Sequence, residues 1–149
     1  MTTIELIESI VCTYENISPE LLQQRTRATK VKEARQIVMY LSCNNKVTES
    51  EAGGYYHQIA STAHHAKVAI AGLREFDKSL NDKLCYYEHK INQLTVVRSK
   101  IDYYTRLIEP ITTEIKETED RMIDYSEKLA NLKKVANDLK EEFEKIVMT

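Results

Sequence analysis

The sequence predicts an all-α fold, and three observations carry this prediction. The 149 residues include only 3 Gly and 2 Pro, too few for a protein of many strands joined by tight turns. Apolar residues make up 42% and charged residues 30%, which argues against both a disordered chain and a membrane protein. Apolar residues also recur every three or four positions along most of the chain. This length suits one domain, or a small domain with an appendage.

Capping signals mark two helices near the N-terminus. Thr2 and Glu5 have the spacing of a capping box, in which each residue satisfies a free backbone amide of the other. Ser18 supplies a cap oxygen directly before Pro19, which suits the first helical position because it needs no amide hydrogen. These signals predict helices at about 3–14 and 19–23.

A basic loop separates these helices from the next one. Residues 25–31 show no apolar periodicity, whereas Ala34, Ile37, Val38 and Leu41 recur at helical spacing. We therefore expect a loop followed by a helix at about 32–44.

The order of the next elements is that of a helix-turn-helix unit. Thr48 and Glu51 form a second capping box, which predicts a short helix at about 49–56. Gly53 and Gly54 inside it favour either a close approach of another backbone or an early end of the helix. A further helix follows, with Ser61 or a neighbour as its cap. Helix, turn, short helix, turn and helix is the helix-turn-helix order with extra N-terminal helices.

The last half of the chain predicts two long helices. Apolar residues are spaced by three or four from Leu80 to Ile108, and after Pro110 they alternate strictly between steps of four and three as far as Ile146. This is a coiled-coil pattern. Proline disfavours helical geometry in the residue before it, so an antiparallel hairpin of arms 77–108 and 111–147, broken at Glu109-Pro110, is the first interpretation. A continuous kinked helix that pairs with a second subunit is the alternative. We expect domains at 1–76 and 77–149.

The charge is unevenly distributed. The net charge is −2, yet residues 23–36 carry five cations against the single acid Glu33. A cluster of this kind is either a solvated surface or a contact for nucleic acid. The cations are Arg25, Arg27, Lys30, Lys32 and Arg35.

The basic loop and the following helix resemble domain IV of the bacterial replication initiator DnaA. The stretch Arg27 to Ser42 reads RATKVKEARQIVMYLS, and its Arg35 to Leu41 is similar to the family's R-Q-I-A-M-Y-L. Downstream, Glu51 to Gly53 is similar to E-I-G, and residues 59–66 align with the signature D-H-[ST]-T-V-x-H-A. The similarity spans about residues 3–94, and the coiled-coil arms lie largely beyond it.

The resemblance implies a double-stranded DNA-binding role. Arg27 takes the position of the family's minor-groove arginine, and the other cations of the loop would surround it as phosphate contacts. Ser61 and Thr62 take positions at the start of the recognition helix that face the major groove. The full set of candidate DNA contacts is Arg25, Arg27, Lys30, Lys32, Arg35, Lys46, Thr48, Ser61, Thr62 and His64.

Two departures from the family pattern affect this expectation. The family's Asp-His pair, which carries much of the base readout, is Ile59-Ala60 here. An aliphatic side chain can touch a thymine methyl but cannot make the bidentate hydrogen bonds that discriminate bases. This sequence also contains no G-x-x-x-x-G-K-[ST] motif, so the ATPase of the initiator is not expected.

The remaining patterns argue against other functions. Cys85 and His89 have helical ligand spacing, but a zinc site needs four ligands and no second close pair is evident. No nucleophile motif occurs, so we expect a non-enzymatic protein with no cofactor, metal or nucleotide. Three widely spaced cysteines and no secretory signal indicate a reducing, cytoplasmic location with no membrane segment.

We expect double-stranded DNA as the partner, with replication or transcription control in a bacterium, phage or mobile element as the setting. A homodimer through the C-terminal helices and a protein partner are further expectations. The alternative function is a protein-interaction adaptor that keeps the DnaA-like fold but has lost sequence-specific DNA reading.

Overall fold

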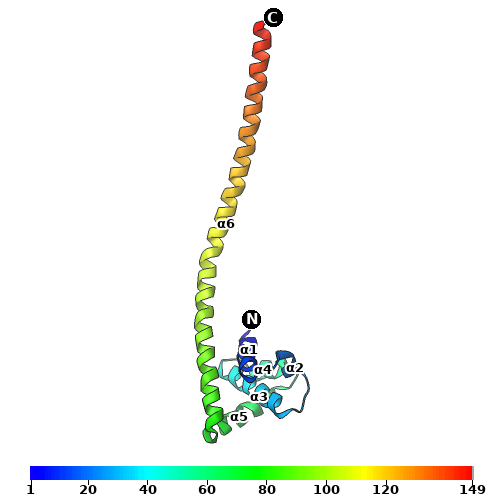
Figure 1. Ribbon diagram of the computed structural model, residues 1–149, viewed down its shortest axis with the longest axis vertical. Helices are drawn as coiled ribbons and strands as arrows, with labels where there is room; N and C mark the ends of the chain where they lie inside the picture. The colour runs from blue at the N-terminus through cyan, green and yellow to red at the C-terminus, as the bar shows by residue number, and fades with distance from the viewer. Residues whose placement is uncertain (149) are drawn as a thin grey trace. The chain divides into compact units, whose positions relative to one another are not determined.

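The computed structural model describes residues 1–148, and its regular elements in that range are all helices (Figure 1). This confirms the predicted all-α class. The helices are α1 (Thr3–Glu15), α2 (Pro19–Gln23), α3 (Thr29–Asn44), α4 (Glu49–Tyr55), α5 (Ala60–Phe76) and α6 (Lys78–Met148).

Side-chain caps begin three of these helices at the predicted residues. The hydroxyl of Thr2 accepts a hydrogen bond from the amide of Glu5, whose carboxylate accepts one from the amide of Thr2. Thr48 and Glu51 repeat this capping box at the start of α4. Ser18 accepts from the amide of Leu21 ahead of α2. Local pairs of this kind do not depend on distant residues, which is why the sequence located them.

Two helix starts differ from the prediction. Helix α3 begins at Thr29, three residues before the expected position, so Lys30 belongs to its first turn. Helix α5 begins at Ala60, and its cap residue is Ile59, two residues before Ser61, where Ser61 or a neighbour was expected. Ile59 makes no side-chain hydrogen bond to the first turn. Neither helix has a capping side chain that could have marked its start.

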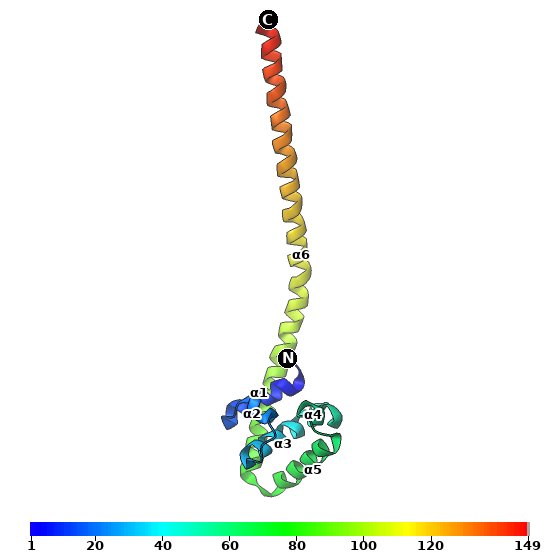
Figure 2. The same ribbon diagram turned by 90° about the vertical axis from the view of Figure 1, so that its right-hand side faces the viewer.

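Helix α3 forms the centre of the N-terminal unit, residues 1–97. Helices α1, α2, α4 and α5 all pack against it, and Figure 2 shows α4 and α5 joined by a short turn. The centre of α3 is completely buried: Ile37, Val38 and Leu41 have no exposed surface. The helix-turn-helix pair, α4 and α5, therefore packs against the helix that the periodicity predicted at about 32–44.

The first turns of α6 complete this core. Leu80, Leu84, Tyr87 and Ile91 are buried in the same hydrophobic cluster as α3. The compact unit thus extends to Val97, beyond the boundary at residue 76 that we expect from the sequence. The physical reason is that the apolar stripe at the start of α6 packs inside this unit.

An arginine also ties α6 to this unit. Both terminal nitrogens of Arg74 lie within hydrogen-bond distance of Glu88, at 2.7 and 2.9 Å. The guanidinium also donates to the hydroxyl of Tyr40 at 3.2 Å. The ion pair raises the pKa of Arg74, so the charge is retained at every physiological pH.

The predicted hairpin in the C-terminal half is wrong. Helix α6 is continuous and contains Pro110. Proline removes one backbone donor, so the helix forfeits a single hydrogen bond to the carbonyl of Arg106. Beyond the proline, the hydroxyls of Thr112 and Thr113 bond the carbonyls of Ile108 and Glu109 at 3.0 Å each. The remaining backbone hydrogen bonds of this helix of 71 residues outweigh the local cost of Pro110, which the sequence interpretation overestimated.

The second unit, residues 98–149, is described to Met148 and consists of α6 alone. Its side chains are exposed throughout the described range. Across residues 1–148, no helix combines the length and the apolar character that crossing a bilayer would require.

Candidate nucleic-acid interface

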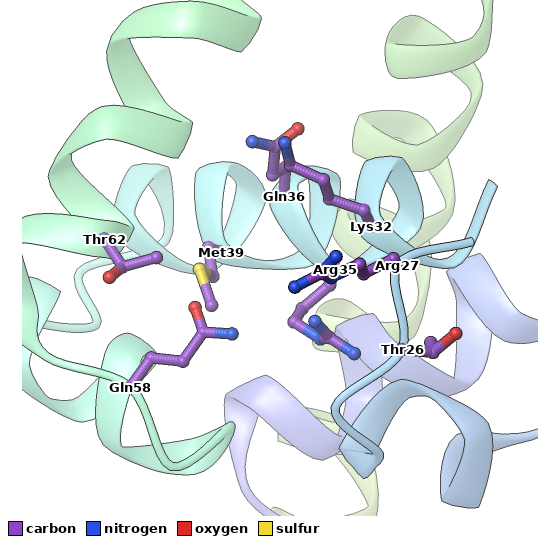
Figure 3. A pocket seen from close by; sticks show the side chains of 8 residues that line it. All are labelled: Thr26, Arg27, Lys32, Arg35, Gln36, Met39, Gln58 and Thr62. Atoms are coloured by element: carbon purple, nitrogen blue, oxygen red, sulfur yellow. The ribbon is translucent and has the colours of Figure 1, made fainter. Parts of the chain in front are cut away.

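A surface hollow of about 450 Å³ lies where three predicted site segments meet. Its walls come from the loop between α2 and α3, from one face of α3, and from the start of α5 with the turn before it. The predicted basic loop is shorter in the structure, at residues 24–28, because α3 begins at Thr29. The lining residues are Thr26, Arg27, Lys32, Arg35, Gln36, Met39, Gln58 and Thr62 (Figure 3). The fold therefore brings the basic segment beside the start of the second helix of the helix-turn-helix, as the resemblance implies.

The hollow has a cationic side and an uncharged polar side. Figure 3 shows Arg27 and Lys32 on one side of Met39, with Gln58 and Thr62 on the other. Arg27 and Lys32 are exposed, whereas Thr62 is half-buried in the first turn of α5. Cations can bind phosphate oxygens and the amide and hydroxyl groups can bond base edges or phosphates. The hollow therefore joins both kinds of contact on one surface.

Arg35 holds the basic loop in place through hydrogen bonds to backbone carbonyls. It is only 7% exposed, and its guanidinium donates to the carbonyls of Leu22 at 2.8 Å and Gln24 at 2.6 Å. These carbonyls belong to the end of α2 and the start of the loop. From the sequence, Arg35 is expected to be a surface cation like its neighbours. The structure instead places it in the floor of the hollow, bonded to the chain's own backbone.

A buried chain of contacts continues from Arg35 to α1. The guanidinium carbon of Arg35 lies 5.8 Å from the ring centre of Tyr56. The hydroxyl of Tyr56 donates to Glu8 at 3.1 Å, and that of Tyr55 donates to the same carboxylate at 2.6 Å. Burial and the nearby carboxylate raise the pKa of both tyrosines, so both hydroxyls stay protonated as donors. The buried carboxylate of Glu8 therefore holds the end of α4 directly, and it holds the basic loop indirectly, through Tyr56 and Arg35.

Gly53 sets the close approach between α4 and the turn that precedes α5. A β-carbon at this position would lie 2.7 Å from the carbonyl oxygen of Ile59. The amide of Gln58 bonds the carbonyl of Gly53 at 2.9 Å, and His57 in the turn has a positive φ of 56°. The expectation that another backbone approaches the glycine pair closely is confirmed at Gly53 but not at Gly54, which has open space around it.

The other two cations of the loop region differ in their surroundings. Arg25 is exposed in the loop and does not line the hollow. The ammonium of Lys30 donates to the carbonyl of Glu15, at the end of α1, at 2.6 Å. Because helix C-termini attract positive charge, Lys30 is held toward α1.

Four predicted residues in the helix-turn-helix lie outside the hollow. Ser61 is exposed in the first turn of α5. His64 contacts the carboxylate of Glu49 at 3.1 Å, and this hydrogen bond lowers the pKa of Glu49. Thr48 is occupied as the cap of α4. Lys46 lines a separate hollow beside the start of α1.

Sequence reasoning missed four residues that line the hollow, namely Thr26, Gln36, Met39 and Gln58. Gln36 follows Lys32 by one helical turn, so its place on the same face was available from spacing. Gln58 lies in the turn before α5, and no sequence signal indicated that this turn faces α3. Within residues 1–148 no group of three or more His, Cys, Asp and Glu side chains could hold a metal ion.

Residues 4–70 match the family model described as the bacterial DnaA protein helix-turn-helix. The match confirms the resemblance and identifies a DNA-binding helix-turn-helix fold. It runs from α1 into α5 and includes all ten candidate DNA contacts. Domains of this type are typically non-catalytic. Helix α6 lies beyond the matched residues.

Proposed function

We propose that the chain binds double-stranded DNA through the basic loop and the first turn of α5. The observation that carries the proposal is the shared hollow, in which Arg27 and Lys32 lie opposite Gln58 and Thr62. Arg27 would enter the minor groove, where a narrow groove concentrates negative potential. Lys32 and Arg25 would bind the flanking phosphates.

The start of α5 would lie at the major groove. No side chain of residues 1–148 caps its first turn, so the amides of Ala60 and Ser61 are left to bind an outside acceptor such as a phosphate oxygen. Ser61 and Thr62 add hydroxyl donors at the same end. The protein would act by occupying a DNA site, as in replication or transcription control of a bacterium, phage or mobile element.

The DNA sequence preference would differ from that of the family. Ile59, where the family has Asp, is 71% exposed at the end of α5 that would meet DNA. It can contact a thymine methyl group but cannot donate or accept a hydrogen bond. We expect a preference for thymine at that position and weaker discrimination overall, measurable by selection of binding sites from random duplexes.

The decisive experiment measures duplex binding by the full chain and by the Arg27→Ala variant, using fluorescence anisotropy over a range of salt concentrations. Arg27→Ala should weaken binding about tenfold, about 1.4 kcal/mol, because it removes a cation from a narrow groove that concentrates negative potential. Lys32→Ala should lower the slope of log affinity against log salt by about 0.9, the value for one phosphate contact. Arg106→Ala, an exposed arginine on α6, is the matched control and should change neither. Absence of duplex binding at low salt, or equal effects of Arg27→Ala and Arg106→Ala, would overturn the proposal.

A protein-binding role is the second candidate, and the exposed Ile59 favours it. An aliphatic side chain at the tip of α5 suits an apolar protein surface better than a base edge. In that case a protein captured by the chain would remain bound when Arg25, Arg27 and Lys30 are replaced by Ala, whereas Ile59→Asp would release it.

A further inference from the structure

One apolar face of α6 has no covering element in the described chain. We name it the seam: the residues that follow one another at alternating steps of four and three from Val97 to Phe143. They are Val97, Ile101, Tyr104, Ile108, Ile111, Ile115, Thr118, Met122, Tyr125, Leu129, Leu132, Ala136, Leu139 and Phe143. The twelve large apolar side chains among them are 50–67% exposed.

The seam keeps a single heptad register across Pro110. Ile108 and Ile111 continue the same alternation before and after the proline, and Pro110 itself lies on the outer side of the helix at the third position of its heptad. The steps of three on either side of Leu94 break this register, close to Ile91, the last buried residue of α6. The stripe packed in the first unit and the seam are therefore two separate surfaces. A hairpin would not require an unbroken register through Pro110, whereas a continuous coiled coil does.

We propose that the seam pairs with the seam of a second copy of this chain in an antiparallel coiled coil. The core layers favour this direction. When Val97 is placed opposite Phe143 of the second copy, the two seams overlap from end to end. Tyr104, the largest residue of its half, then meets Ala136, the smallest of the other half. A parallel pair would instead place Tyr104 on Tyr104 and Ala136 on Ala136, giving one crowded layer and one poorly filled layer.

The charges beside the seam discriminate more strongly between the two directions. In the antiparallel pair, Lys100 faces Glu142 of the second copy and Glu114 faces Lys128, each contact occurring twice by symmetry. In a parallel pair, Glu114 would face Glu119 and Lys128 would face Lys133, and no oppositely charged flanking pair would form. Lys128 already contacts Asp124 of its own helix at 2.7 Å, but both side chains are more than half exposed, so this contact competes weakly.

The antiparallel pair also contains unfavourable contacts. Arg98 would face Lys140 of the second copy, and Arg121 and Glu119 would each face their own equivalents near the twofold axis. These contacts offset the attractive ones in number. In the parallel arrangement, however, every contact between charged flanking residues is repulsive. The balance of attractive and repulsive contacts therefore favours the antiparallel pair.

The consequence is a separation of the two DNA-binding units. The seam spans about 70 Å, since an α-helix rises 1.5 Å per residue. In an antiparallel pair the N-terminal units join opposite ends of the seam, so they would engage two separate DNA sites instead of adjoining half-sites. This consequence rests on the proposed DNA binding, whereas the dimer does not.

Charge reversal on the full chain tests the dimer and its direction, with sedimentation equilibrium as the measurement. Glu114→Lys should raise the dimer dissociation constant about tenfold in the antiparallel pair, because two attractive contacts become repulsive. It should lower the constant in a parallel pair, where it would relieve the contact with Glu119. Adding Lys128→Glu should restore the affinity. Glu117→Lys, on the outer side of the helix, is the control and should have little effect.

Cysteine pairing gives a second measurement, in a chain carrying Cys85→Ser to remove the exposed native thiol. Ile101→Cys and Leu139→Cys chains, mixed and oxidised, should form a disulfide-linked heterodimer, while neither variant should cross-link to itself. Self-cross-linking of Ile101→Cys, a tighter dimer for Glu114→Lys, or a monomer at high micromolar concentration would each overturn the proposal. None of these measurements involves DNA, so failure of the dimer and failure of DNA binding are distinguishable.

Discussion

The two units of the chain use the same apolar spacing for different purposes. Leu84 and Leu129 both lie on α6 in stripes spaced by three and four residues. Leu84 is completely buried in the hydrophobic core of the first unit, whereas Leu129 is 53% exposed. Periodicity thus determines which face of a helix is apolar. What covers that face depends on the rest of the chain or on a partner.

The largest expected effect tests this contrast directly. Leu84→Ala should lower the free energy of unfolding of the N-terminal unit by about 3–4 kcal/mol, because it leaves a cavity in a closed core. Leu129→Ala should change that stability by less than about 0.5 kcal/mol, as expected for an exposed site. Native-state hydrogen exchange of the α3 amides between Ile37 and Leu41 reports this unit selectively. Equal protection losses in the two variants would show that the stripe is one continuous packed surface.

The two adjacent glycines of α4 provide a second contrast, inside the N-terminal unit. Gly53→Ala should destabilise this unit by about 2 kcal/mol, because the new β-carbon would meet the backbone of Ile59 and force α4 and α5 apart. Gly54→Ala has open space and should stabilise the helix by about 0.5–1 kcal/mol. Thermal unfolding of both variants should therefore shift the midpoint in opposite directions. Shifts of the same sign would contradict the close approach at Gly53.

The sequence located elements whose signals are local. The cap residues Thr2, Ser18 and Thr48 predicted the starts of α1, α2 and α4, because their hydrogen bonds span only three residues. The hairpin prediction was wrong because the free-energy cost of Pro110 is local, whereas the helix that contains it is long. The unbroken heptad register across Pro110 was present in the sequence and would have favoured the continuous helix.

The candidate site was predictable in residue type but not in arrangement. Spacing and the family resemblance identified Arg27, Lys32 and Thr62, which the fold brings to one hollow. The burial of Arg35 could not be deduced, because its partners are backbone carbonyls that only the folded loop positions. The place of Gln58 likewise depends on the close approach between α4 and Ile59. Interactions between distant segments were therefore the part that the sequence did not reveal.

The smallest expected effect concerns the polar contact between α1 and α6. The carboxylate of Glu15 accepts hydrogen bonds from Lys83 at 2.7 Å and from the hydroxyl of Tyr87 at 2.8 Å. Burial alone would raise the pKa of Glu15, but the hydrogen bonds from Lys83 and Tyr87 outweigh it, so the pKa lies below its ordinary value. A depressed carboxyl pKa contributes stability that is present above the ordinary value and is lost as the pH falls through the folded-state pKa.

Glu15→Gln should therefore lower the free energy of unfolding of the N-terminal unit by about 1 kcal/mol at neutral pH. The difference from the wild type should shrink as the pH falls below about 4, the ordinary range of a glutamate, because protonation then removes the same charge from the wild type. Urea unfolding at several pH values, followed through the exchange of the α3 amides, measures this difference. Glu141→Gln on the exposed part of α6 is the matched control and should leave the unit unchanged at every pH. A Glu15→Gln deficit that persisted undiminished into acid would mean that the contact acts through the shape of the side chain, and the charged link between α1 and α6 would then contribute nothing to the stability of the unit.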